Sequence, residues 1–245
     1  PGATIARNDG DAAAALASGR RIEAVYDVPF QNHSPMEVMN ATVHVRKDGA
    51  EAWLPTQGPE WGLGAIAAIT GLPPERIVVH TTLMGGGYGR RYHSDFVAEA
   101  TQISKAVDAP VKLVFTREDD TQHGFYRPAS LHRFEGAVDD KGQPTAWHHR
   151  MSSVSIDGYW TPPDKAKPAS SEINGAVNLP YAIKNLRLEY TPAKSGVPVM
   201  WWRSVEYSVN GFVTESFVDE LAAAAKKDPL EFRRGAIERK PGSQG

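Results

Sequence analysis

The chain has 245 residues, and its 41% hydrophobic and 23% charged content is that of an ordinary globular protein with a sizeable core. A formal net charge of −2 argues against the broad basic surface of a nucleic-acid-binding protein, and no apolar run approaches the length of a membrane-spanning helix. The chain contains no cysteine, which excludes disulfides, thiolate metal ligands and cysteine nucleophiles from it.

Apolar periodicity and turn signals predict helices and strands that are mixed along the chain. Up to residue 116 we expect, in order, a helix over 11–18, strands over 21–30, 40–45 and 50–54, a helix that begins at Pro59, a strand over 76–83, a helix after Ser94 and a strand over 111–116. After it we expect a hairpin of 131–138 with 146–155, a short strand over 187–190, and helices over 210–227 and 230–239. Strand hairpins mixed with helices make the fold class α+β, and residues 76–116 resemble a local βαβ unit.

Two loops and two helix faces are also predicted. Residues 117–120 form a dense charged run that favours a solvated loop, and residues 161–171 are rich in proline and lysine, which is typical of an exposed loop. Ser94 can cap the helix that follows it, and the spacing of apolar residues predicts which side chains of two helices face inward. They are Phe96, Val97, Ala100, Ile103, Ala106 and Val107 in the first helix, and Phe212, Phe217 and Leu221 in the helix over 210–227.

The most unusual stretch, residues 84–91, holds four glycines in five positions. Backbone without Cβ atoms can adopt positive φ and approach another body closely. A strand, a glycine turn and a helix in succession point backbone N–H groups at an anion, usually a phosphate. The stretch fits neither the P-loop nor the Rossmann pattern, and a tight packing turn is the alternative. Arg90 and Arg91 add charge and donors, which favours anion binding.

Other candidates for chemistry are few. The sequence has no G-x-S-x-G nucleophile elbow, and none of its eight histidines has H-x-x-x-H spacing on a helix. His148 and His149 are adjacent in a predicted strand, so their rings point to opposite faces, which favours surface or core positions over metal binding. Arg203, beside Trp202, and Arg127 are each either structural or directed into a site.

Several stretches together resemble the molybdenum-binding large (beta) subunit of the xanthine dehydrogenase/aldehyde oxidase family, and in particular its isoquinoline 1-oxidoreductase type. They follow the order and spacing of that family over most of the chain. The stretches are QNHSPMEVMNAT (31–42), WLPTQ (53–57), GGGYGRR (85–91), TREDD (116–120), YRP (126–128), WRSV (202–205), ESFVDEL (215–221) and KDPLEFR (227–233).

The resemblance implies a molybdopterin cofactor with molybdenum, in the cytosine dinucleotide form, and a bacterial enzyme of the cytoplasm or periplasm. It implies an oxidoreductase that hydroxylates an aldehyde or an N-heterocycle, with water as the oxygen source. The implied partners are the remaining part of the large subunit and a small subunit whose [2Fe–2S] clusters receive the electrons. Because the pterin dithiolene holds the metal, no direct metal ligand is expected from this cysteine-free chain.

The resemblance also implies roles for individual residues by matched position. Gln31 would hydrogen-bond the apical oxo or sulfido region of the molybdenum, the glycine stretch would bring backbone amides to the phosphate and pterin side, and Arg203 would donate to the cofactor. The full set of implied cofactor contacts is Gln31, Gly86, Gly87, Tyr88, Gly89, Arg90 and Arg203. Tyr92, Arg127 and Val205 are implied to lie near the substrate channel.

Departures from the family pattern bear on function. Val38 stands where the family often has proline, and Tyr92 stands about where xanthine dehydrogenases carry a substrate-directing glutamate, which argues against purines. The family's catalytic glutamate belongs to a C-terminal region without a counterpart here, so we expect no catalytic residue within the chain. We expect residues 1–245 to be a partial molybdopterin-binding domain that is inactive by itself.

Two other functions remain open from the sequence. One is a non-catalytic binding or assembly module that keeps the scaffold without the metal. The other is a nucleotide-binding βαβ enzyme that uses residues 85–89.

Overall fold

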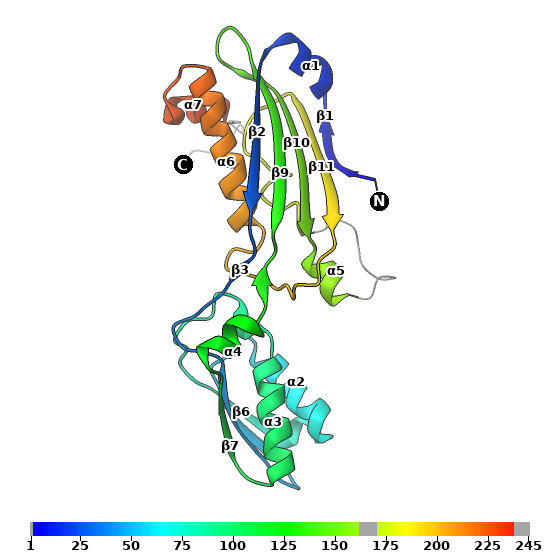
Figure 1. Cartoon of the computed structure of the whole chain (residues 1–245), viewed down its shortest axis with the longest axis vertical. Coiled ribbons are helices and arrows are strands. Elements are labelled where there is room, and N and C mark those ends of the chain that lie inside the picture. Colours follow the sequence, from blue (N-terminus) through cyan, green and yellow to red (C-terminus); the bar gives the residue numbers. More distant parts are fainter. Residues whose placement is uncertain (1, 162–170, 238–245) are drawn as a thin grey trace. The chain divides into compact units, whose positions relative to one another are not determined.

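The computed structural model describes residues 2–161 and 171–237, and the chain divides into two compact units (Figure 1). Unit 1 is built from residues 1–30, 128–199 and 204–245, and unit 2 from residues 31–127 and 200–203. The chain therefore contributes to unit 2 twice, once as a long continuous stretch and once as a segment of four residues.

A five-stranded sheet forms the centre of unit 1, in the order β1–β11–β10–β9–β2 (Figure 1). Its strands are β1 (Thr4–Asp9), β2 (Arg20–Val28), β9 (Ser130–Val138), β10 (Pro144–Val154) and β11 (Asn185–Ala193). Neighbouring strands are antiparallel except β10 and β11, which run parallel. The turn from β9 to β10 is held by Asp139, whose carboxylate accepts from the backbone N–H groups of Lys141 and Gln143.

Helices pack on both faces of this sheet. On one face, α6 (Tyr207–Ala224) packs against β2 and β9, and α7 (Pro229–Ala236) follows it with Asp228 as its N-cap. On the other face lies α1 (Ala12–Ser18), whose N-cap Asp11 accepts from the backbone N–H of Ala14. The short helix α5 (Ile156–Trp160) follows β10.

Successive side chains along a strand point to opposite faces of the sheet, which explains why helices pack on both faces. Phe134 and Trp147 point toward α6, where their rings meet Phe217 at centroid distances of 4.8 and 5.1 Å. Ala137 and Ala146 point the other way and form a small cluster with Leu16 of α1. The larger core of unit 1 therefore lies between the sheet and α6.

Unit 2 contains a four-stranded sheet in the order β6–β5–β4–β7 and a two-stranded ladder of β3 with β8. The strands are β3 (Gln31–Asn32), β4 (Asn40–Val45), β5 (Ala50–Leu54), β6 (Ile77–Thr81), β7 (Val111–Val114) and β8 (Tyr126–Arg127). The helices are α2 (Pro59–Thr70), α3 (Asp95–Val107) and α4 (Arg117–Gln122), with 3-10 turns at Pro74–Arg76 and Arg90–Tyr92. α2 and α3 pack on each other, and Ile66, Phe96 and Ala100 are fully buried in the core of this unit.

The predicted α+β class is confirmed, as are the hairpin of β4 with β5, the hairpin of β9 with β10, and the helix that begins at Pro59. The predicted βαβ unit is different in detail. β6 and β7 lie at opposite edges of the sheet, whereas β5 and β6 are the adjacent parallel pair, joined through α2. Local sequence patterns do not distinguish these two arrangements, because each places a helix between two strands.

Two other predictions about local structure were wrong. The charged run at 117–120 belongs to α4, where Thr116 and Asp119 form a capping box and Asp120 is buried. Ser94 precedes α3, but its side chain makes no capping hydrogen bond. Most of the predicted loop over 161–171 lies outside the described residues.

The inward faces of the two longest helices were only partly predicted. In α3, Phe96, Val97 and Ala100 are buried as expected, but Ile103, Ala106 and Val107 are exposed, and Thr101 and Ser104 are buried in their place. In α6, Phe217 and Leu221 are buried, whereas Phe212 is exposed. Among the described helices, none combines the length and the apolar composition that a bilayer crossing requires.

Two histidines lie in the core of unit 1. His132 of β9 and His149 of β10 are fully buried, with Nδ1 of His132 3.0 Å from Nε2 of His149. The ring of His149 also stacks on Phe134 at a centroid distance of 3.9 Å. Burial disfavours the imidazolium form, and it lowers the pKa of His132 to about 4 and the pKa of His149 as well.

Because the unfolded chain protonates these histidines more readily, we expect the free energy of unfolding to fall as the pH falls. Between the ordinary pKa of 6.5 and about 4, the unfolded state binds more protons than the folded state, so stability is greatest above this window. The shift at His132 alone predicts a loss of about 2 kcal/mol between pH 7 and pH 5, measurable from urea unfolding curves.

Two variants check which histidine causes this loss. His123→Gln, at an exposed site, should keep the full pH dependence, whereas His132→Gln should reduce it. Equal unfolding free energies of the wild-type protein at pH 7 and pH 5 would contradict the assignment.

Candidate functional site

The glycine turn of unit 2 follows β6 and precedes the 3-10 turn at Arg90–Tyr92. Gly86 and Gly89 adopt φ of +102° and +104°, and Tyr88 between them adopts +54°, a conformation that costs a non-glycine residue about 1 kcal/mol. Within the described residues, the backbone N–H groups of Gly86, Gly87 and Tyr88 donate no hydrogen bond. Successive free N–H groups in a turn form a concave site for an anion.

Two side chains hold the ends of this turn. Glu37 accepts from the backbone N–H of Gly85 at 2.7 Å, and its own N–H donates to the carbonyl of Gly85. Partial burial would raise the pKa of Glu37, but the bonds from Gly85 and Asn40 and the charge of Arg91 lower it overall, so Glu37 is an anion. At the other end, Oε1 of Gln57 accepts from the N–H of Gly89 at 3.0 Å. The turn is therefore anchored at both ends while its middle amides remain free.

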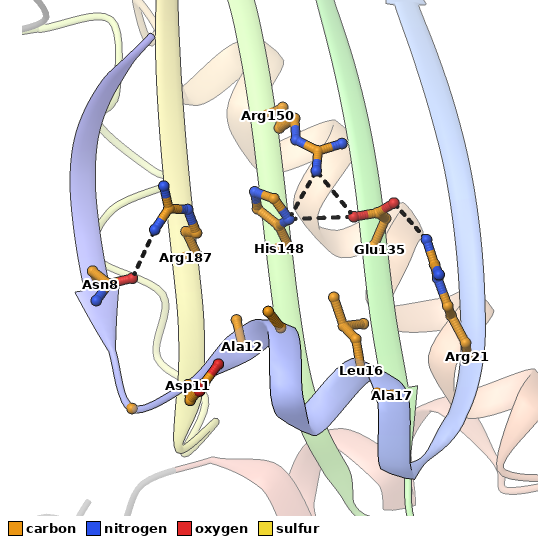
Figure 2. A pocket seen from close by; sticks show the side chains of 12 residues that line it. Asn8, Asp11, Ala12, Leu16, Ala17, Arg21, Glu135, His148, Arg150 and Arg187 are labelled. Atoms are coloured by element: carbon orange, nitrogen blue, oxygen red, sulfur yellow. Dashed lines mark hydrogen bonds and ion pairs between the residues drawn. The ribbon is translucent and has the colours of Figure 1, made fainter.

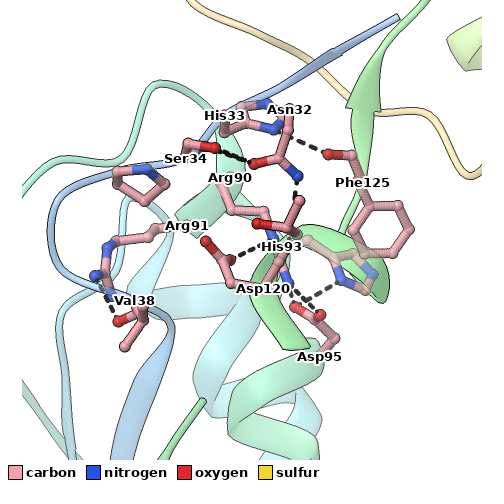
Figure 3. Close-up of polar contacts among 12 residues, drawn as sticks. Asn32, His33, Ser34, Val38, Arg90, Arg91, His93, Asp95, Asp120 and Phe125 are labelled. Carbon is pink, nitrogen blue, oxygen red and sulfur yellow. Dashed lines mark hydrogen bonds and ion pairs between the residues drawn. The ribbon is translucent and has the colours of Figure 1, made fainter. Parts of the chain in front are cut away.

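The side chains of the two arginines after the turn point into the protein. Arg91 is fully buried, and its guanidinium donates to the carbonyls of Gly86, Pro55, Glu37 and Val38 and to the carboxylate of Glu37. Arg90 is 1% exposed and makes a bidentate pair with Asp95 at 2.6 and 2.8 Å (Figure 3). The guanidinium of Arg90 also lies 5.2 Å from the ring centre of Phe125. Both charges therefore stabilise the turn from within.

Acidic groups on α3 and α4 balance Arg90. Asp95 is held as an anion: burial acts to raise its pKa, but bonds from His93 and Arg90 bring it down to about 2. Asp120, fully buried on α4, receives a hydrogen bond from Arg117 at 2.9 Å and lies 4.0 Å from Nε of Arg90. Burial raises the pKa of Asp120 against the influence of these arginines. The predicted cofactor contact of Arg90 stays a prediction, since its side chain is engaged within the protein.

Arg203 has the opposite environment. Its side chain is exposed, and within the described residues it makes no hydrogen bond or ion pair. The segment that carries it lies against the turn, because a Cβ added to Gly89 would overlap the carbonyl oxygen of Trp201. Arg203 is thus a free cation two residues beyond a carbonyl that touches the glycine turn.

The ladder of β3 with β8 brings two further predicted residues together. Gln31 is directly opposite Arg127. The side chain of Gln31 is exposed and makes no hydrogen bond within the described part of the chain. Arg127 is half-buried, and burial lowers its pKa.

The other two residues predicted near a substrate channel lie in different units. Tyr92 of unit 2 is exposed, and its ring meets that of Trp201 edge to face at 5.8 Å and that of Trp61 at 6.1 Å. Val205 belongs to unit 1 and adopts φ of +50°, after Ser204 at +69°. A positive φ at a β-branched residue is unusual and marks local strain.

Sequence reasoning gave no role to three residues that organise this site, namely His33, Glu37 and Gln57. All three lie in stretches that carried the family resemblance, 31–42 and 53–57. His33 is buried, with one ring nitrogen 3.2 Å from the carbonyl of Phe125 (Figure 3). The other ring nitrogen lies 2.8 Å from the carbonyl of Trp201. The motifs could have identified these residues, but only the structure shows what they contact.

A separate cavity of about 570 Å³ lies on the α1 side of the sheet in unit 1 (Figure 2). Its arginines are already paired with carboxylates. Glu135 accepts from Arg21 at 2.7 Å and lies 3.2 Å from Nδ1 of His148, and Arg187 pairs with Glu189 at 2.5 Å. His148 lies here and His149 in the core, on opposite faces of the sheet as predicted. These ion pairs indicate that the charged groups at this cavity have a structural role.

Comparison with known proteins identifies the family of the chain. A model of the molybdopterin cofactor-binding domain matches residues 1–237. The chain is 31% identical over 222 residues to isoquinoline 1-oxidoreductase subunit beta of Brevundimonas diminuta, covering 88% of this chain and 28% of that protein. It is 26% identical over 236 residues to the aldehyde oxidoreductase molybdenum-binding subunit PaoC of Escherichia coli K12, covering 95% and 31%.

The fold also matches solved structures. Quinoline 2-oxidoreductase from Pseudomonas putida 86 superposes with a TM-score of 0.80 at 18% identity, over 96% of this chain and 30% of that one. The chain thus spans less than a third of the length of each of these three proteins, all of them oxidoreductases by name. Because the family model matches nearly its whole length, the chain belongs to the molybdopterin cofactor-binding domain family.

Proposed function

We propose that unit 2 binds the phosphate and pterin side of a molybdopterin cofactor. The observation that carries the proposal is the row of three free N–H groups at Gly86, Gly87 and Tyr88, in a turn that only glycine could form at Gly89. These donors suit the oxygens of a phosphate, and Arg203 supplies an unpaired guanidinium on the neighbouring segment. The residues present therefore fit the group that the family binds.

Each proposed contact uses atoms that the protein leaves free. Backbone amides of the turn would donate to phosphate oxygens, and Arg203 would donate to the cofactor from the segment beside Gly89. The amide of Gln31, which makes no bond within the described residues, would donate to the apical ligand of the molybdenum. When bound, the cofactor supplies the metal and the redox chemistry, and its dithiolene holds the metal, so the chain needs no cysteine for this task.

We propose the cytosine dinucleotide form of the cofactor. Its pyrophosphate carries two adjacent phosphates, and a row of consecutive amides matches such a group better than one isolated donor would. Gly86 and Gly87 lack side chains that would keep a bulky pyrophosphate away from the backbone.

For the whole protein we propose oxidative hydroxylation of an aldehyde or an N-heterocycle. A substrate C–H bond becomes C–OH with the oxygen of water, and two electrons and two protons leave. The electrons would pass to [2Fe–2S] clusters on a small partner subunit, and the rest of the large subunit would complete the site. Tyr92 offers a ring in place of a carboxylate, which favours these substrates over purines.

The first experiment is to isolate the natural complex through this chain, identify its polypeptides and quantify molybdenum, iron and released nucleotide. Molybdenum and iron with a cytidine nucleotide support the proposal. A complex without metal and nucleotide would instead favour the non-catalytic scaffold.

Replacing Arg203 with alanine should lower the molybdenum and pterin content of the purified complex. A hydrogen bond from a charged donor contributes about 1.5–3 kcal/mol, so we expect at least about tenfold weaker cofactor retention during dialysis. Lys112→Ala removes an exposed cation from β7 of the same unit and should leave retention unchanged. Equal retention in Arg203→Ala and Lys112→Ala would exclude Arg203 as a contact.

Gly89→Ala should also reduce cofactor content, because the new methyl group is strained at φ of +104° and overlaps the carbonyl of Trp201. The matched control is Gly64→Ala in α2, where an added Cβ meets no atom within 4 Å. We expect roughly tenfold lower retention in Gly89→Ala alone, with far-UV circular dichroism unchanged in both variants. Full cofactor retention in Gly89→Ala would show that the contact with Trp201 is dispensable.

A further inference from the structure

We infer that His33 is a positioning residue that fixes the segment over 200–203 against the rest of unit 2 and so directs Arg203 toward the glycine turn. This inference rests on the proposed cofactor contact of Arg203. It assigns a role to a histidine that would touch neither the cofactor nor the substrate, but only the backbone of the segment that carries a contact residue.

The first line of evidence is how few hydrogen bonds hold this segment. Within the described residues, residues 201–203 make one hydrogen bond, which is the bond between Nε2 of His33 and the carbonyl of Trp201 at 2.8 Å. Met200, just before them, donates its N–H to the carbonyl of Tyr126 at 3.0 Å. The segment is also packed: Met200 is fully buried, Trp201 meets Tyr92 edge to face, and the carbonyl of Trp201 lies against Gly89. His33 therefore supplies the last hydrogen bond before Arg203.

The second line of evidence is that one carbonyl serves two contacts. The oxygen of Trp201 accepts from His33, and the same oxygen lies where a Cβ of Gly89 would be. His33 thus holds this oxygen against the one position of the turn that has room for it. A shift of Trp201 away from Gly89 would move Arg203, two residues further on, relative to the free amides of the turn.

The chemistry of the imidazole shows which bond matters. A neutral ring has one N–H and can donate to only one of the two carbonyls that it faces. Burial lowers the pKa of His33 and outweighs the two carbonyls and Asp120, which act to raise it, so the ring is neutral at neutral pH. The shorter distance assigns the N–H to Nε2 and the bond to Trp201, and leaves Nδ1 at 3.2 Å from the carbonyl of Phe125.

This assignment allows a test with two nearly isosteric variants. A glutamine places its amide nitrogen about where Nε2 lies, so His33→Gln keeps the donor to Trp201. An asparagine places its amide nitrogen about where Nδ1 lies, so His33→Asn keeps only a donor to Phe125. His33→Leu removes both donors at similar volume.

The variants are compared in the complete complex by two measurements. The first is hydrogen exchange of the backbone over 199–203, which reports on the tether whether or not cofactor is bound. The second is the molybdenum and pterin content after dialysis. We expect His33→Gln to match the wild-type protein within about twofold, and His33→Asn and His33→Leu to exchange faster and retain roughly tenfold less cofactor.

The outcomes separate this inference from the proposed function. Full cofactor retention in His33→Asn and His33→Leu, with retention lost in Arg203→Ala, overturns the role of His33 and leaves the proposed function standing. A wild-type complex without molybdenum and pterin overturns the proposed function itself. If the variants do not accumulate, ¹⁵N NMR of histidine-labelled wild-type protein decides: a proton on Nε2 of His33 supports the tether, and a proton on Nδ1 overturns it.

Discussion

The buried guanidinium of Arg91 is the interaction on which unit 2 depends. Its donors reach carbonyls from three separate stretches: Glu37 and Val38 before β4, Pro55 after β5, and Gly86 within the turn. Glu37 neutralises the charge at 2.9 Å. A planar group with donors in fixed directions can satisfy several carbonyls at once, which a lysine could not do in the same place. Removing one partner of such a buried pair leaves an uncompensated charge, so the site tolerates little change.

Because these charged groups are paired inside the unit and hold the turn in place, the turn can keep its own backbone N–H groups free. An unpaired backbone N–H is costly in a protein interior, and a loop without anchors would relax to satisfy it. Here Glu37 and Gln57 hold the two ends, and Gly86, Tyr88 and Gly89 adopt left-handed backbone. The backbone strain and the free N–H donors are both concentrated in this turn. A bound anion there would offset part of the free-energy cost of the strain and of the unpaired donors.

Much of the fold could be predicted from the sequence, because turns and caps are encoded locally. The stretch 46–49 ends β4 and starts β5, and Pro59 begins α2, with no help from distant residues. Features that depend on distant partners were missed. The inward face of α3 shifted because Oγ of Ser104 bonds the backbone N–H of Val45 and the carbonyl of Ala109, so a polar residue is buried where Ile103 was expected.

The candidate site shows the same division. The glycines of the turn are visible in the sequence, and so is the motif that contains Arg203. The direction in which the Arg90 and Arg91 side chains point is not visible in the sequence. It is set by Asp95 and Glu37, which belong to a helix and to a distant loop. Judged from the local sequence alone, adjacent arginines beside a glycine turn suggest an anion site. Only their partners in the structure show that both charges are paired within the protein.

The pairing of Gln31 with Arg127 has a consequence for the order in which the chain folds. β2 ends at Val28, and its partner β9 begins at Ser130, so almost all of unit 2 separates two neighbouring strands of unit 1. Closing so long a loop costs conformational entropy when the intervening chain is unfolded. Once β3 and β8 have paired, the two ends of the insertion are already together, and β2 meets β9 as if across a short connection. Early folding of the insertion would thus speed completion of the sheet that surrounds it in the sequence.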